Sequence, residues 1–197
     1  MGKVKIISPE EAAGLLKDGD TFTTGGFVAS CIPEALNKAV ERRFLETGHP
    51  RDLTYIYASS QGNKDGSGGE HYAHKGLLKR FIAGHWATVP ALGEMAMRNE
   101  IEGYNLPQGT LSQLFRDIAA HKPGTITPVG LGTFIDPQNG GGKVNSITTE
   151  DLVERITIKG KEYLFYPAFP IRVAFLRGTC ADERGNVTLE KEIASLE

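Results

Sequence analysis

A pair of glycines lies between a predicted strand and a predicted helix near the start of the chain. Residues 18–36 read DGDTFTTGGFVASCIPEAL, and the alternation over residues 21–24 predicts a strand that runs into Gly25 and Gly26. A helix follows near Pro33. Glycines at such a junction let the backbone approach a ligand, and they leave the first helical N–H groups open to negative charge. The segment predicts either a plain tight turn or a ligand site at a strand end of an α/β sheet.

Strand and helix patterns alternate over the first two-thirds of the chain. The predicted helices cover residues 8–16, 33–46, 74–79, 92–99 and 110–120, and the predicted strands cover residues 21–24, 53–58, 81–85, 104–106, 153–158, 162–166 and 172–177. A polar, glycine-rich loop spans residues 59–69, and Lys159-Gly160-Lys161 joins two strands as a hairpin. This order predicts an α/β fold with an open, mainly parallel sheet, flanking helices and a small antiparallel hairpin.

The composition excludes several classes of function. The 197 residues suit one domain, and a net charge of −2 gives no basic footprint for nucleic acid or an anionic membrane. No apolar run is long enough to span a bilayer, and the first residues lack a signal-peptide core. Two cysteines form neither a disulfide framework nor a metal motif, so we expect a cytoplasmic protein. His71 and His74 beside Glu70 lack a third ligand at helical spacing, so we expect no metal site.

Four short motifs occur in an order that resembles the family I coenzyme A transferases. They are GGF at 25–27 between Asp18-Gly19 and Pro33, LPQGTL at 106–111, PVGLGT at 128–133 and ADERGN at 181–186. The stretches 60–63, 78–86, 135–143 and 163–170 are similar to the single-chain propionate or short-chain acyl CoA-transferases. The resemblance covers essentially the whole chain. Thr23 and Thr24 stand where apolar residues are usual in the family, and Cys31 stands where glycine is usual.

The resemblance and the residues together imply a crevice at the carboxyl edge of the sheet. Gln108 lies at a strand–helix junction, where its amide can donate and accept at once, as a carboxylate or a thioester carbonyl requires. The glycines near 130 are expected to let a third strand end approach the same place. The predicted crevice residues are Gly25, Gly26, Phe27, Val28, Gln61, Asn63, Gln108, Gly109, Gly130 and Gly132.

The family exchanges CoA between two acyl groups by a ping-pong route through a glutamyl-CoA thioester. Its nucleophilic glutamate lies in the second half, in a Glu-x-Gly-x-x-Gly-like motif that this sequence lacks. The resemblance therefore implies that residues 1–197 are an N-terminal lobe, truncated before its last strand and inactive alone. Its implied partners are the C-terminal half, an acyl-CoA, a short-chain carboxylate such as propionate or acetate, and further copies in a homo-oligomer. CoA is a substrate, and no resident cofactor is expected.

Two other functions are compatible with the same pattern. One is a non-catalytic ligand-binding or regulatory module, because sugar-isomerase-like regulators share the broad fold. No DNA-binding helix-turn-helix precedes residue 9, which disfavours that alternative. The other is a structural dimerisation lobe with no ligand. A reading frame that continues into the glutamate motif would favour the enzyme over both.

Overall fold

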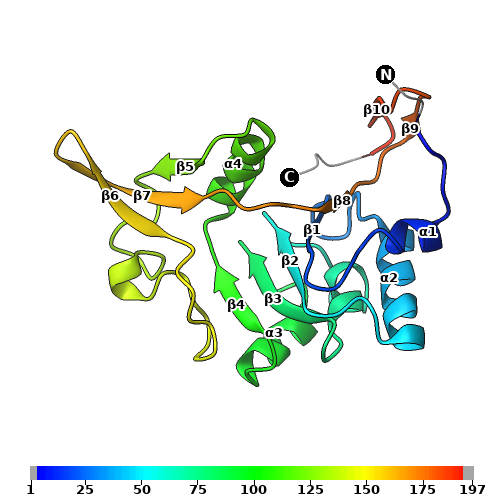
Figure 1. Ribbon diagram of the computed structural model, residues 1–197, viewed down its shortest axis with the longest axis horizontal. Coiled ribbons are helices and arrows are strands. Elements are labelled where there is room, and N and C mark those ends of the chain that lie inside the picture. Colours follow the sequence, from blue (N-terminus) through cyan, green and yellow to red (C-terminus); the bar gives the residue numbers. More distant parts are fainter. Residues whose placement is uncertain (1–3, 193–197) are drawn as a thin grey trace.

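A five-stranded parallel sheet forms the centre of the molecule (Figure 1). The computed structural model describes residues 4–192. Its elements are α1 (Pro9–Ala13), β1 (Thr21–Thr24), α2 (Glu34–Thr47), β2 (Leu53–Tyr57), the 3-10 helix η1 (Gly68–Tyr72), β3 (Leu78–Ala83), α3 (Pro90–Met97), β4 (Glu102–Asn105), α4 (Gln108–Ala119), β5 (Gly124–Thr127), the 3-10 helix η2 (Pro137–Asn139), β6 (Glu154–Ile158), β7 (Lys161–Pro167), β8 (Val173–Phe175), β9 (Cys180–Ala181) and β10 (Val187–Thr188).

The order of the central sheet is β4-β3-β2-β1-β8, and every neighbouring pair is parallel. The chain therefore adds β2, β3 and β4 on one side of β1, and returns much later to place β8 on the other side. The predicted α/β class with a mainly parallel sheet is confirmed. Because the chain adds strands first on one side of β1 and later on the other, the strand order reverses between β1 and β8, and such a topological switch point is where open α/β sheets bind their ligands.

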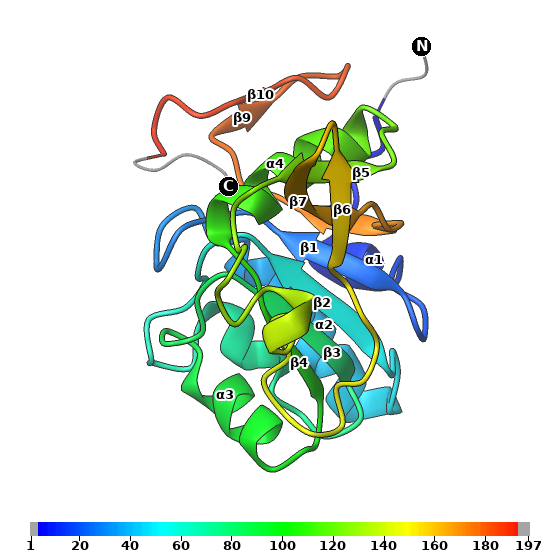
Figure 2. The same ribbon diagram turned by 90° about the vertical axis from the view of Figure 1, so that its left-hand side faces the viewer.

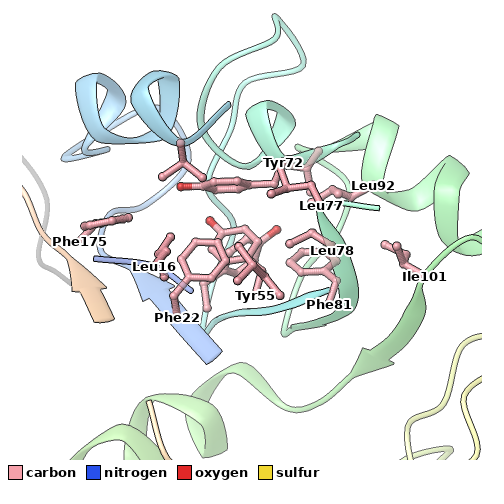
Figure 3. Close-up of a cluster of buried hydrophobic side chains, with 14 of the residues drawn as sticks. Leu16, Phe22, Tyr55, Tyr72, Leu77, Leu78, Phe81, Leu92, Ile101 and Phe175 are labelled. Atoms are coloured by element: carbon pink, nitrogen blue, oxygen red, sulfur yellow. The ribbon is translucent and has the colours of Figure 1, made fainter. Parts of the chain in front are cut away.

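Two hydrophobic cores cover the two faces of this sheet. The first packs alternate residues of the strands, among them Phe22, Tyr55 and Phe81, against α1, α2, η1 and α3 (Figure 3). Its rings interlock, and Phe22 stacks on Tyr55 with centroids 4.8 Å apart. The second packs the intervening residues, such as Ile56 and Ile82, against α4 and β7. The central strands of the sheet are covered on both faces by these cores. The loops at the carboxyl ends of these strands are therefore anchored in the packed interior.

A second sheet of three antiparallel strands, β5-β7-β6, lies at the end of the molecule away from α1 and α2 (Figure 1; Figure 2 faces this end). The predicted hairpin at Lys159-Gly160 joins β6 to β7, and β7 also pairs with β5. A small hairpin of β9 and β10 follows β8. The antiparallel part is therefore larger than the single hairpin that the sequence predicted.

Several local predictions are confirmed and others are wrong. Ser8 and Glu11 form the capping box expected at the start of α1, each accepting from the other's backbone amide at 3.1 and 3.0 Å. The helix predicted over residues 74–79 is wrong, because these residues form a turn and the first part of β3. The strand predicted at 81–85 instead runs from 78 to 83. Strands β5, β9 and β10 were not predicted at all.

Candidate functional site

Four loops meet at the carboxyl edge of the central sheet because β1 to β4 run in the same direction. They begin at Gly25 after β1, at residue 58 after β2, at Gly84 after β3 and at Leu106 after β4. The glycine turn lies at the switch point itself, where the Gly25 amide donates to the Phe175 carbonyl of β8 at 2.9 Å. This edge is the candidate active site, since it combines the predicted motifs with the position at which α/β sheets hold ligands.

Hydrogen bonds on both sides hold the glycine turn in place. Phe27 and Ser30 exchange backbone bonds of 2.9 and 2.8 Å, and the Val28 amide donates to the Ser60 carbonyl at 2.6 Å. The backbone amides of the predicted crevice residues Gly25, Phe27 and Val28 thus already have acceptors. Within the described residues no acceptor pairs with the amides of Gly26 and Ala29, so these two amides are the donors that the turn can offer to a ligand.

The backbone of this turn adopts conformations that side chains disfavour. Gly26 has φ of +126°, and a Cβ there would lie 2.9 Å from the Ser30 carbonyl oxygen. Val28 and Cys31 have φ of 53° and 58° although neither is glycine. A β-branched residue at positive φ is an outlier, and such strain costs about 1–3 kcal/mol per residue and gathers at functional sites. The Cys31 that replaces the family's usual glycine therefore occupies a position that suits glycine.

Gln61 supports the glycine turn through buried hydrogen bonds. We call its network with Thr24 and Tyr55 the brace. The Gln61 side chain is 0% exposed, its Nε2 donates to the Thr24 carbonyl, and its Oε1 accepts from the Thr24 hydroxyl. The Tyr55 hydroxyl completes the chain at 2.7 Å from Thr24 Oγ1. Burial raises the pKa of Tyr55 well above its usual value, so its hydroxyl keeps its proton. This network accounts for Thr24, which departs from the apolar residue usual in the family, and it makes Gln61 a positioning residue.

The other predicted residue of this loop, Asn63, is exposed. Its Nδ2 lies 3.4 Å from a carboxylate oxygen of Asp65. The backbone of the loop is nevertheless tied to the glycine turn, because the Gly62 amide donates to the Val28 carbonyl at 3.0 Å. The structure therefore separates the two amides: Gln61 is buried within the brace, and Asn63 faces outward.

Gln108 begins α4 immediately beyond β4, and it packs against the end of the neighbouring strand. A Cβ at Gly84 would lie 2.8 Å from both Cα and Cβ of Gln108, and 2.3 Å from the Ala58 carbonyl oxygen. Gly84 thus lets the ends of β2, β3 and β4 meet at one place, and sequence reasoning did not single it out as a site residue. Gly109 is exposed, with open space where a side chain would be. Gln108 and the glycine turn lie on the same edge of the sheet.

Gly130 and Gly132 lie elsewhere in the topology. They follow β5, which belongs to the antiparallel sheet, so the expectation that they mark a third end of the parallel sheet is wrong. A Cβ at Gly130 would lie 2.8 Å from the hydroxyl of Tyr166 on β7. The Gly132 amide donates to Asp136 Oδ2 at 2.8 Å. Gly130 therefore lets the loop after β5 pack closely against β7, Gly132 stabilises that loop through its bond to Asp136, and a role in the crevice stays a prediction for both.

The two histidines considered as metal ligands instead join α2 to the segment around η1. His71 lies between two carboxylates of α2, with Nε2 2.7 Å from Glu34 and Nδ1 2.6 Å from Glu41, and His74 contacts Glu41 at 2.6 Å. Glu70 accepts from the Ala91 amide at the start of α3. Within residues 4–192 no group of histidine, cysteine or acidic side chains is arranged to hold a metal ion. This polar cluster fixes the helix that follows the glycine turn.

Comparison with known proteins agrees with this geometry. The family model for coenzyme A transferase matches residues 6–197. The caffeate CoA-transferase of Acetobacterium woodii is 45% identical over 188 residues, which are 95% of this chain and 36% of that enzyme. The acetate CoA-transferase subunit alpha of Escherichia coli is 30% identical over 188 residues, which are 95% of this chain and 76% of the subunit.

Among solved structures, the acyl-CoA transferase YdiF of E. coli O157:H7, described as a thioester complex with CoA, superposes with a TM-score of 0.95 at 36% identity. The match covers 98% of this chain and 38% of YdiF. The chain therefore spans well under half of these two longer enzymes. None of the helices in the part of the chain described here is long and apolar enough to cross a membrane. The extent of the family match and the shared fold show that the chain belongs to the coenzyme A transferase family.

Proposed function

We propose that this chain forms the N-terminal, alpha-type part of a family I CoA-transferase that exchanges CoA between short-chain carboxylic acids such as propionate and acetate. The observation that supports this function most is the strained glycine turn at the β1/β8 switch point, with Gly26 as one of its two unpaired donors. The relative named acetate CoA-transferase subunit alpha supports a short-chain acid as substrate, whereas caffeate, named for the other relative, is a larger aromatic acid.

The proposed reaction is a ping-pong exchange through a glutamate outside this chain. That carboxylate attacks the acyl-CoA carbonyl and forms an acyl-glutamyl anhydride, with release of the CoA thiolate. The thiolate then attacks the glutamyl carbonyl, which frees the first carboxylic acid and leaves a glutamyl-CoA thioester. The second carboxylic acid repeats the two steps in reverse, so no resident cofactor is required.

In this mechanism the chain supplies contacts to the reacting carbonyl and to the acyl group. The Gly26 amide would stabilise the oxyanion of a tetrahedral intermediate, since a fixed N–H donor costs no reorganisation in the transition state. The Phe27 side chain, 42% exposed beside that amide, offers an apolar wall to a short acyl chain. The Gln108 amide would orient the carboxylate, because it can donate and accept.

The remaining parts of the enzyme would come from a C-terminal half, either on the same polypeptide or as a second subunit. The match to an acetate CoA-transferase subunit alpha supports such a beta-type partner. We propose a cytoplasmic setting, in which Cys31 and Cys180 stay reduced; both are free thiols in this structure.

An exchange assay tests this function. CoA transfer from propionyl-CoA to acetate should be undetectable with the 197-residue chain alone, and it should appear when the C-terminal half of the enzyme is added. Mass spectrometry should find the glutamyl-CoA adduct on the added half. Turnover by this chain alone, or an adduct on one of its own glutamates, would contradict the proposed division of roles.

A further inference from the structure

The antiparallel sheet has one face on the core and another face whose apolar residues belong to neither buried core of the described residues. Side chains of directly paired residues lie on the same face of a sheet. The pairs Ile126↔Phe165 and Ile156↔Tyr163 therefore share one face, and the pairs involving Leu164 and Tyr166 share the other. We call the first one the outer face; it carries Ile126, Ile156, Ile158, Tyr163 and Phe165, with Glu154 and Lys161.

The two faces differ in burial. Leu164 and Tyr166 are 0% and 1% exposed and belong to the second core. None of the five apolar residues of the outer face belongs to either buried core of residues 4–192: Ile126 and Ile158 are 49% and 42% exposed, and Ile156, Tyr163 and Phe165 are half-buried. The sheet projects from one end of the molecule, with β6 at its edge (Figure 1). An uncovered apolar face on an edge hairpin indicates a contact with another chain.

The outer face carries a negative charge at one end and a positive charge at the other, so it is complementary to a second copy of the same face in the opposite orientation. Glu154 pairs with Phe165 at the base of the hairpin, and Lys161 pairs with Ile158 at its tip, roughly 13 Å away at 3.3 Å per residue. Within the described part of the chain neither Glu154 nor Lys161 forms an ion pair. On the opposite face, by contrast, Arg155 and Glu162 pair at 2.9 Å. One negative and one positive end, with apolar residues between them, make a surface that can bind a second copy of itself.

We propose that the outer face is a two-fold contact between two copies of this chain. An axis that lies between the two sheets and passes between Ile156 and Tyr163 brings Glu154 of each copy to Lys161 of the other. The strands of the two sheets then cross at about 30–40°, close to the angle of roughly 30° usual for packed sheets. An interface of this kind uses the same patch on both subunits, and its flanking charges fix their orientation.

Charge reversal tests this contact without removing apolar side chains. Sedimentation of the 197-residue chain across the micromolar range should show a reversible dimer. Either Glu154→Lys or Lys161→Glu should weaken dimerisation by about tenfold or more, since each places like charges opposite one another twice. The double reversal should restore the dimer. Glu46→Lys, the same charge change on the exposed side of α2, should have no effect.

A mixture of the two single variants gives the sharpest result. Glu154→Lys carries two positive charges on the outer face and Lys161→Glu carries two negative ones, so the pair should form a heterodimer when neither variant dimerises alone. Thermal melting of each variant confirms that it is folded. A monomer throughout the concentration range, a dimer that both single reversals leave unchanged, or a failure of the mixed variants to associate would each overturn the proposal.

Discussion

The turn after β1 and the turn between β6 and β7 both contain a non-glycine residue with a left-handed backbone, but for different reasons. Lys159 and Gly160, with φ of 49° and 77°, suit a two-residue hairpin, whose primed turns follow the twist of the strands. Nothing lies within 4 Å of a Cβ built at Gly160. Val28, at 53°, is held by backbone bonds to two residues of the next loop. The hairpin turn is local, whereas the β1 turn depends on tertiary contacts.

This contrast teaches where the fold holds strain. Disfavoured backbone persists only where the surrounding structure over-determines it, and such positions cluster at functional sites. The brace of Gln61, Thr24 and Tyr55 beneath the β1 turn is the surrounding structure that does so here. The hairpin has no comparable support, which agrees with a role in packing or assembly.

The largest effect on stability is expected from the brace. Gln61→Ala leaves the buried carbonyl of Thr24 without its donor and opens a cavity, which should lower the free energy of unfolding by about 2–4 kcal/mol. Asn63→Ala removes an amide from the same loop, but an exposed one, and should change stability by less than about 0.5 kcal/mol. Urea unfolding of both variants measures the difference. Equal losses would mean that the brace does not hold the turn.

The two turns should respond differently when their glycines are replaced. Gly26→Ala combines a φ of +126° with a Cβ 2.9 Å from a backbone oxygen, so we expect a loss of about 2–3 kcal/mol. Gly160→Ala meets open space and only the left-handed penalty of about 1 kcal/mol. Thermal melts of the two variants compare the turns directly, and a larger loss at Gly160 would reverse the comparison.

A smaller effect is expected from pH at the helix that follows the β1 turn. Burial raises the pKa of Glu41, but hydrogen bonds from His74 and His71 lower it by more, so the pKa of Glu41 lies below 4.5. The pKa of Glu34 is lowered in the same way, by hydrogen bonds from His71 and from the Gly68 amide that outweigh its burial. The unfolded chain then binds more protons, so this stabilisation is present above pH 4.5 and is lost as pH falls through the lowered values. Glu41→Gln should make the acid-side loss of stability shallower. Glu46→Gln serves as the exposed control on the same helix. If Glu41→Gln left the pH dependence of the free energy of unfolding unchanged, the histidine–glutamate cluster would not contribute to stability.

The parts of the fold that depend on local pattern were predictable, and those that depend on distant partners were not. Alternating strands and helices identified the parallel sheet, and Ser8 with Glu11 identified a capped helix. Strand β5 has only four residues and exists through its pairing with β7, some forty residues later. The segment 74–79 was predicted as a helix, yet its last two residues belong to β3, which pairs with β2.

The candidate site shows the same division. The glycines at 25 and 26 and the amide of Gln108 could be proposed from the sequence because glycines and strand–helix junctions leave a local signal, and their role at the site stays a prediction. The role of Gln61 could not be predicted, since a polar residue in a glycine-rich loop gives no sign that Thr24 will bind it in the core. Gly84 has a weak signal, a glycine at a strand end, but its close approach to Gln108 becomes visible only in three dimensions.

The central claim is that the carboxyl edge of the parallel sheet binds the reacting acyl group. The most direct test is kcat/KM for propionyl-CoA and acetate exchange by the complete enzyme carrying Gln108→Ala. Loss of one polar contact to a buried group, about 1–3 kcal/mol, predicts a decrease of about 5- to 150-fold. Gln113→Ala, on the exposed side of the same helix, should leave kcat/KM unchanged. Unaltered kinetics in Gln108→Ala would contradict the claim and leave Gln108 as a structural residue of α4.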